Sequence, residues 1–212
     1  MSPHHARPRQ EGIMRWRRHH PKGRGPYAAY TFDFDGTLAD TAAVNHAAVL
    51  AALGAHGITV TAAWLGAEPV FTAAQLRRRL TLPPTALPED TFVHEARAYW
   101  FAHTDQILPI TAAATAARTA AEHAAIAVVS ANYSDIVRAG LTIIGLDDLP
   151  WTVVGRDHVT HPKPAPDAYL HAAHLLRVEP GGCLAHEDTD EGITAATTAG
   201  LYVLDIRQLS WR

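Results

Sequence analysis

The hydrophobic pattern changes character at about residue 27 and again at about residue 111. From residue 111 onward, short apolar runs alternate with stretches whose apolar positions repeat at helical spacing. Strands separated by helices of about 10–15 residues are typical of a parallel sheet wound by right-handed crossovers. The predicted strands are 27–32, 125–130, 151–155, 182–186 and 201–206, and the predicted helices are 111–123, one from Ser134, 166–176 and 191–200.

The stretch between the first strand and residue 111 has helical patterns only. They cover about 41–56, 72–81 and 89–104, with Gly and Pro between them, and this stretch has no strand pattern. We therefore predict an α/β fold, with a Rossmann-like parallel sheet core and a small helical cap inserted after the first strand. The predicted core is 27–44 and 106–212, and the predicted cap is 45–105.

Residues 1–26 differ from the rest of the chain in composition. They contain seven Lys or Arg and one acidic residue, with almost no apolar periodicity. Such a segment cannot bury enough apolar surface to fold alone, so we expect a disordered basic arm.

Composition narrows the class of protein further. Of the 212 residues, 48% are hydrophobic, which is enough for a core, and the net charge of −3 argues against a nucleic-acid role for that core. The single cysteine, Cys183, excludes an internal disulfide and fits a reducing cytoplasm. No apolar run approaches the roughly 18 residues of a membrane span. We expect a cytoplasmic monomer that does not bind a membrane.

Polar side chains with complementary chemistry follow four of the predicted strands. Ligands of open α/β sheets bind at the carboxyl ends of the strands, so these side chains should meet at one edge. They are Asp33 and Asp35 after the first strand, Ser130 after the second, Lys163 in the loop after the third, and Glu187 and Asp188 after the fourth.

This set of side chains predicts phosphoryl transfer. Two facing carboxylate clusters repel each other unless a divalent cation lies between them, and hard oxygen ligands favour Mg²⁺. A lysine offsets phosphate charge, and a serine hydroxyl donates to a phosphoryl oxygen. Asp33 could attack phosphorus, and Asp35 could protonate the leaving oxygen and later activate water.

Four segments resemble the motifs of the haloacid dehalogenase-like hydrolases. The segment DFDGTLADT, residues 33–41, resembles the first motif, and Ser130 the second. KPAPD, residues 163–167, is similar to the third, and EDTDEG, residues 187–192, to the acidic fourth. The resemblance covers the chain from about Tyr27 to Trp211. It is greatest to the β-phosphoglucomutase-like branch, particularly its sugar-phosphate phosphatases.

This resemblance implies a role for each motif residue. Asp33 would be the nucleophile, Asp35 the acid/base, and Lys163 the group that orients Asp33. Mg²⁺ would be held by Asp33, the Asp35 backbone carbonyl, Asp188 and Glu187, the last directly or through water. Thr37 and Ser130 would hold phosphoryl oxygens, and we place Gly36 and Asn132 with the substrate-binding residues. The implied reaction is the hydrolysis of a small phosphate monoester. The implied substrate is a small phosphorylated metabolite, with sugar phosphates as the expected class. Asp40 is interpreted as structural, an acid capping the start of a helix.

Three other functions stay open. A phosphosugar mutase of this branch has a histidine five positions after the equivalent of Asp40, where this chain has Asn45, with His46 one place later. A one-residue displacement turns a helical side chain by about 100°, and residues 27–162 contain no lysine, so hydrolysis is favoured. Dehalogenation is disfavoured, because it needs neither magnesium nor an acid at position 35, and this chain has Asp35 and the pair Glu187 and Asp188. A non-catalytic binding or regulatory module is the third alternative.

Overall fold

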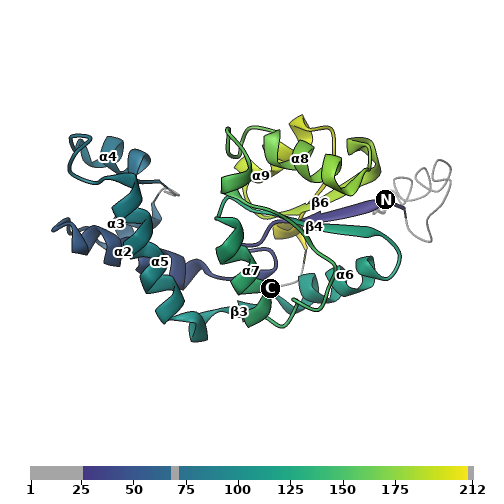
Figure 1. The fold of residues 1–212 in the computed structure, drawn as a ribbon, viewed down its shortest axis with the longest axis horizontal. Coiled ribbons are helices and arrows are strands. Elements are labelled where there is room, and N and C mark those ends of the chain that lie inside the picture. Colours follow the sequence, from purple (N-terminus) through teal and green to yellow (C-terminus); the bar gives the residue numbers. More distant parts are fainter. Residues whose placement is uncertain (1–25, 68–71, 210–212) are drawn as a thin grey trace, which may run out of the picture.

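The computed structural model describes residues 26–67 and 72–209 of the chain (Figure 1). The predicted basic arm, apart from Pro26, lies outside the described residues. The described part contains a parallel sheet covered by helices and a separate group of helices beside it.

The central sheet has five parallel strands in the order β5-β4-β1-β6-β7. β1 lies in the middle, pairing Thr31 with Ala127 of β4 and with Ala185 of β6. The strands are β1 Ala29–Phe32, β4 Ala125–Val129, β5 Thr152–Val154, β6 Cys183–Glu187 and β7 Tyr202–Asp205. All five fall within one residue of their predicted segments or inside them, which confirms the predicted α/β sheet.

Helices cover both faces of this sheet, as Figure 1 shows. On one face, α6 and α7 pack against Phe32, Ile126 and Val128. On the other face, α8 and α9 pack mainly through alanines against Ala127 and Ala185. The helices are α6 Thr111–Ala121, α7 Ser134–Ile143, α8 Asp167–Leu176 and α9 Asp190–Thr198. Both faces of every inner strand are therefore buried, which explains the continuous apolar runs in the sequence.

The segment between β1 and α6 forms the second group of helices. Its members are α2 Ala42–Ala55, α3 Ala62–Gly66, α4 Ala73–Leu80 and α5 Glu89–Ala102. The distal ends share their own apolar cluster, which includes Leu53, Leu76 and Phe92. Val44 of α2 and Trp100 of α5 belong instead to the cluster of the sheet. The predicted cap boundary at residue 45 falls inside α2, so one continuous helix runs from the sheet into the helical group.

Two short strands join this group to the sheet, and the sequence pattern missed both. β2 Ala39–Asp40 and β3 Leu108–Pro109 form an antiparallel pair. Two residues are too few to display alternation, so this pairing depends on the tertiary structure. The five-residue helix α3 was missed because it is little longer than one turn, too short to display a repeat of about 3.6 residues.

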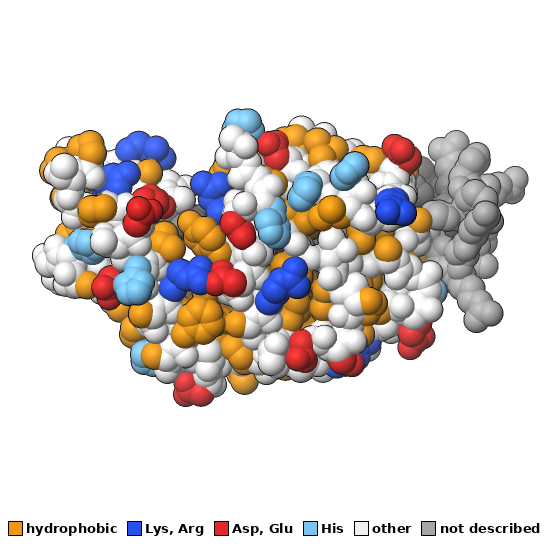
Figure 2. Space-filling view, in the orientation of Figure 1, with side chains coloured by type: hydrophobic (Ala, Val, Ile, Leu, Met, Phe, Trp, Pro, Cys, Tyr) orange, Lys and Arg blue, Asp and Glu red, His pale blue; other side chains and the backbone are white. Residues whose placement is uncertain are grey.

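The surface and the helix lengths add two observations. Figure 2 shows Lys and Arg interspersed with Asp and Glu over the visible face. Among residues 26–67 and 72–209, no helix is both long and apolar enough to cross a membrane.

Candidate active site

Asp33 and Lys163 form a buried ion pair at the carboxyl end of β1. Asp33 directly follows β1, and its backbone amide donates to the His186 carbonyl of the adjacent β6 at 3.0 Å. The ammonium of Lys163 donates to Asp33 Oδ1 at 2.7 Å, and both side chains are more than nine-tenths buried. The sheet thus fixes the backbone of Asp33, and Lys163 fixes its carboxylate.

The surroundings of this pair shift the pKa values of both groups. Burial raises the pKa of Asp33 well above its usual range, Lys163 opposes this, and the charges of Glu187, Asp188 and Asp35 raise it further. Burial alone would lower the pKa of Lys163, but the carboxylates of Asp33 and Glu187 outweigh it and raise that pKa. Lys163 is therefore charged at neutral pH, and the cluster around it holds more carboxylates than it can neutralise.

Glu187, the last residue of β6, is fully enclosed. Its Oε1 accepts from Lys163 at 2.5 Å and from the hydroxyl of Tyr169 on α8. Its Oε2 accepts from Thr189 at 3.4 Å. A Cβ added to Gly192 would lie 2.0 Å from this Oε2, so the backbone of α9 also confines the carboxylate.

Asp188 brings a third carboxylate to the cluster. One carboxylate oxygen from each of Asp33, Glu187 and Asp188 lies within 4.8 Å of the others. Gly36 has a φ of +81°, and a Cβ there would lie 2.1 Å from Asp188 Oδ2, so the turn leaves room for the carboxylate only because residue 36 is glycine. Converging carboxylates of this kind fit Mg²⁺, which binds hard oxygen ligands. The donor set therefore suits the predicted metal.

The side chains of Thr41, Asn45 and Ser130 hydrogen-bond to the carboxylate of Asp35. Its Oδ1 accepts from Thr41 at 2.7 Å and from the Asn45 amide at 2.8 Å, and its Oδ2 accepts from Ser130 at 3.4 Å. Thr41 immediately precedes α2 and Asn45 lies in its first turns. The predicted acid/base is thus connected directly to the helix that leads into the helical group.

The loop after β4 is shaped by its own hydrogen bonds. The Ser130 backbone amide donates to the Val154 carbonyl at 3.0 Å, and the Ser130 hydroxyl accepts from the Asn132 backbone amide at 2.9 Å. The Asn132 side chain accepts from the Tyr133 amide at 3.0 Å. Asn132 therefore shapes the Ser130 loop, and its role in substrate binding stays a prediction.

The structure brings most of the predicted site residues together at one edge of the sheet. Those in direct mutual contact are Asp33, Lys163 and Glu187, then Thr37 with Asp188 at 3.4 Å, and Asp35 with Ser130. Asp40 is an exception among the acids, and the capping interpretation was wrong. It lies in β2 and is exposed, while Thr41 occupies the N-cap position of α2. The chain pairs as a strand at residue 40 and becomes helical only two residues later.

Sequence reasoning missed three residues that contact the site: Thr41, Asn45 and Tyr169. The i, i+4 spacing of Thr41 and Asn45 at the start of a helix was a usable signal, because such residues share one helix face. Tyr169 gave no such signal, since an aromatic residue on an Ala-rich helix is typical of a core position.

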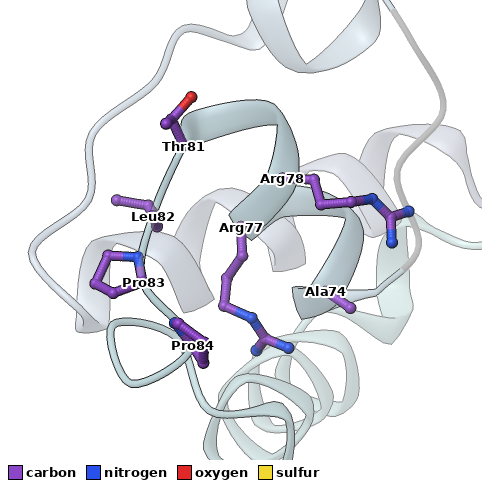
Figure 3. A pocket seen from close by; sticks show the side chains of 7 residues that line it. All are labelled: Ala74, Arg77, Arg78, Thr81, Leu82, Pro83 and Pro84. Carbon is purple, nitrogen blue, oxygen red and sulfur yellow. The ribbon is translucent and has the colours of Figure 1, made fainter.

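An open groove also exists at the far end of the helical group, away from the acidic cluster. It is lined by Ala74, Arg77, Arg78, Thr81, Leu82, Pro83 and Pro84 (Figure 3). The Arg77 guanidinium there donates to the Leu87 carbonyl. None of the predicted site residues lines this groove, so we assign the chemistry to the acidic cluster.

The comparison with known families agrees with this geometry. Residues 27–200 match the haloacid dehalogenase-like hydrolase family. The chain belongs to the haloacid dehalogenase-like hydrolases. The match spans four strands of the sheet and the inserted helices, which confirms the resemblance that the four motifs indicated.

Individual relatives of this hydrolase are phosphatases and mutases. The fructose-1-phosphate phosphatase YqaB of Escherichia coli is 33% identical, over 86% of this chain and 98% of the relative. The β-phosphoglucomutase of Bacillus subtilis is 44% identical, over 22% of this chain and 20% of its own. A solved hydrolase from Pseudomonas syringae superposes with a TM-score of 0.74 at 23% identity, covering 84% of both chains. The family match and the 33% identical phosphatase identify the protein as a hydrolase of phosphate monoesters.

Proposed function

We propose that this hydrolase is a Mg²⁺-dependent phosphatase of small phosphorylated metabolites that works through a phosphoaspartate at Asp33. The observation that carries the proposal is the convergence of Asp33, Glu187 and Asp188, with the ammonium of Lys163 paired to the first two. The arrangement has a surplus of negative charge, which suits a divalent cation together with a phosphate.

The chain's own groups divide the reaction between them. One Oδ of Asp33 attacks phosphorus while the bond from phosphorus to the ester oxygen breaks, and Asp35 gives a proton to that leaving oxygen. Asp35 then takes a proton from water, whose oxygen attacks the phosphoaspartate, releasing inorganic phosphate and restoring Asp33. Thr37 and Ser130 donate to phosphoryl oxygens, and Lys163 holds Asp33 in place.

Mg²⁺ would be held by Asp33, the Asp35 carbonyl and Asp188, with Glu187 nearby. When bound, it supplies positive charge that offsets the carboxylates and the transferring phosphoryl group.

We propose that the inserted helices, residues 45–105, act as a cap that shields Asp33 from water. The antiparallel β2–β3 pair and the start of α2 connect this cap to the core, residues 27–44 and 106–212. A cap that closes and reopens meets two needs, because the nucleophile must be shielded during phosphorylation and the phosphoaspartate must then meet water.

Sugar phosphates are the substrate class that we propose. The relative YqaB is named a fructose-1-phosphate phosphatase and covers most of this chain. The cap's cations support hydrolysis over mutase activity. Three of its four arginines contact protein groups: Arg77 the Leu87 carbonyl, Arg79 the Trp64 ring at 3.8 Å, and Arg97 the Asp135 carboxylate. Few cap cations are left to hold a second phosphate.

We further propose that the protein works as a monomer in a reducing cytoplasm. Its single thiol, Cys183, is buried, and burial raises the pKa of this thiol to about 11. A thiol in this state is protonated and unreactive.

Chelation tests the metal requirement. With Mg²⁺ the protein should hydrolyse p-nitrophenyl phosphate and a panel of sugar phosphates, and excess EDTA should abolish turnover until Mg²⁺ is restored. Circular dichroism in EDTA should show an intact fold, because Lys163 partly neutralises the acids without the metal. Undiminished turnover in EDTA would contradict the mechanism. Inactivity on every phosphate ester with the fold intact would favour a binding module.

Asn45→Ala tests whether the amide of Asn45 keeps Asp35 aligned with the leaving group. We expect kcat/KM for an alkyl phosphate such as a sugar phosphate to fall about tenfold, since an alkoxide needs a proton to leave. For p-nitrophenyl phosphate, kcat/KM should change less than about twofold, since p-nitrophenolate leaves unprotonated.

His46→Ala is the matched control for this variant, because His46 is the next residue of α2 and is exposed. It should behave like the wild type with both substrates. An equal loss on both substrates in Asn45→Ala would indicate a general structural effect and would contradict the role in alignment.

A further inference from the structure

The buried hydroxyl of Tyr169 contacts a carboxylate of the candidate active site. Tyr169 lies on the inner face of α8, is fully buried among small side chains, and donates its hydroxyl to Glu187 Oε1. A buried hydroxyl needs a hydrogen-bond partner, and a bond to a carboxylate is stronger than one to a neutral group. The reaction described above makes no use of this hydroxyl.

The same carboxylate oxygen connects Tyr169 to the nucleophile through Lys163. Glu187 Oε1 also accepts from the Lys163 ammonium at 2.5 Å. The other two hydrogen-bond acceptors of that ammonium are Asp33 Oδ1 at 2.7 Å and the Val129 carbonyl at 2.9 Å, and the ammonium also lies 5.2 Å from the centroid of the Tyr169 ring. An ammonium has three N–H donors, and all three are accounted for. The position of Asp33 Oδ1 therefore depends on where Glu187 holds Lys163.

Tyr169 is the group that fixes the Oε1 end of Glu187. The other carboxylate oxygen, Oε2, accepts a hydrogen bond from Thr189 at 3.4 Å and lies close to the backbone of Gly192. Without the hydroxyl of Tyr169, Lys163 would be the single side chain that donates to Oε1 among the described residues, and the carboxylate could turn about its side-chain bonds.

We propose that Tyr169 is a positioning residue for phosphoryl transfer. Its hydroxyl orients Glu187, Glu187 orients Lys163, and Lys163 holds Asp33 Oδ1 so that the second carboxylate oxygen of Asp33 faces the phosphorus. The inference rests on the proposed function, because it assigns Asp33 as the nucleophile.

Tyr169→Phe removes only the hydroxyl and keeps the ring that fills the core. Loss of one supporting hydrogen bond to a site carboxylate typically lowers activity about 10–100-fold. We expect kcat to fall by at least about tenfold, with KM for a sugar phosphate within about twofold, because the substrate still meets the same donors. Tyr30→Phe is the matched control, since Tyr30 is a partly buried tyrosine of β1 packed against the other face of the sheet.

A spectroscopic measurement tests the positioning directly and needs neither metal nor substrate. The chain has two lysines, Lys22 and Lys163, so the ¹⁵N-lysine spectrum of a Lys22→Arg protein contains the Lys163 ammonium alone. A buried ammonium with three acceptors exchanges slowly and gives a sharp signal. We expect Tyr169→Phe to shift or broaden this signal, and Tyr30→Phe to leave it unchanged.

The outcomes separate this inference from the proposed function. An unchanged Lys163 signal, or a kcat within about twofold of wild type, in folded Tyr169→Phe would overturn the inference. Equal effects in Tyr30→Phe would overturn it as well, because they would indicate a general loss of packing. If Tyr169→Phe does not fold, Glu187→Gln tests the same connection and should also change the Lys163 signal. Full activity of Asp33→Asn would instead overturn the proposed function.

Discussion

Replacing Asp33 with asparagine is expected to lower kcat by at least about 10⁴-fold, the range found when a covalent nucleophile is removed. Asparagine keeps the shape of the side chain and an acceptor for the Lys163 ammonium, which lies 2.7 Å from Asp33 Oδ1. The amide lacks the anionic oxygen that attacks phosphorus.

The fold of Asp33→Asn should be at least as stable as that of the wild type. Asp33 lies close to Glu187 and Asp188, and burial raises its pKa well above the usual range, so its charged form is unfavourable in the metal-free protein. Removing this charge relieves repulsion while Lys163 stays paired with Glu187. Thermal unfolding in EDTA measures this effect separately from activity.

Asp40→Asn is the matched control, because it makes the same change in an exposed acid seven residues further on. It should have wild-type kcat. Acid-quenched wild-type enzyme should carry phosphate on the peptide that contains Asp33, and this adduct should be absent from Asp33→Asn. An adduct on another residue, or retained turnover in Asp33→Asn, would contradict the assignment of the nucleophile.

Lys163→Met should abolish activity and also destabilise the protein. The methionine keeps most of the length of the side chain but removes the ammonium between Asp33 and Glu187, both of which are buried. Breaking a buried ion pair from one side typically costs about 3–5 kcal/mol of unfolding free energy, because the remaining charge is uncompensated. Chemical denaturation at neutral pH in EDTA measures this loss.

The loss of stability in Lys163→Met should depend on pH in a defined direction. Lys163 lowers the pKa of Asp33, so without it this already raised pKa rises further. A carboxyl whose folded pKa exceeds its unfolded pKa destabilises the fold increasingly as the pH rises toward the folded value. The deficit relative to wild type should therefore be smallest in acid, where the carboxyl is protonated in both proteins, and larger at neutral pH.

The double variant Lys163→Met/Glu187→Gln isolates the electrostatic cause. It removes one of the two carboxylates left without the lysine, so it should recover part of the lost stability while activity stays absent. An additive loss of stability in the double variant would show that packing, and not uncompensated charge, explains the effect of Lys163→Met.

The sequence by itself determined the core architecture and most of the site. Apolar runs alternating with helical patterns after residue 111 predicted the parallel sheet, because residues buried on both faces of a strand are continuously apolar. Parallel strands have their carboxyl ends at one edge, so polar residues at those positions were expected to meet. Asp33 and Lys163 do so although 130 positions separate them in the chain.

Tertiary structure alone decided how these groups are held. Asn45 reaches Asp35 only because the start of α2 lies against the turn after β1, and Tyr169 reaches Glu187 only because α8 packs against the face of the sheet that carries Ala127 and Ala185. The pattern of apolar positions reports whether a residue is buried and in which kind of element. It does not report which buried polar atom a side chain meets, because that depends on how separate elements pack. The strands β2 and β3 were hidden for another reason, since two residues are too few to display alternation and their pairing depends on the tertiary structure.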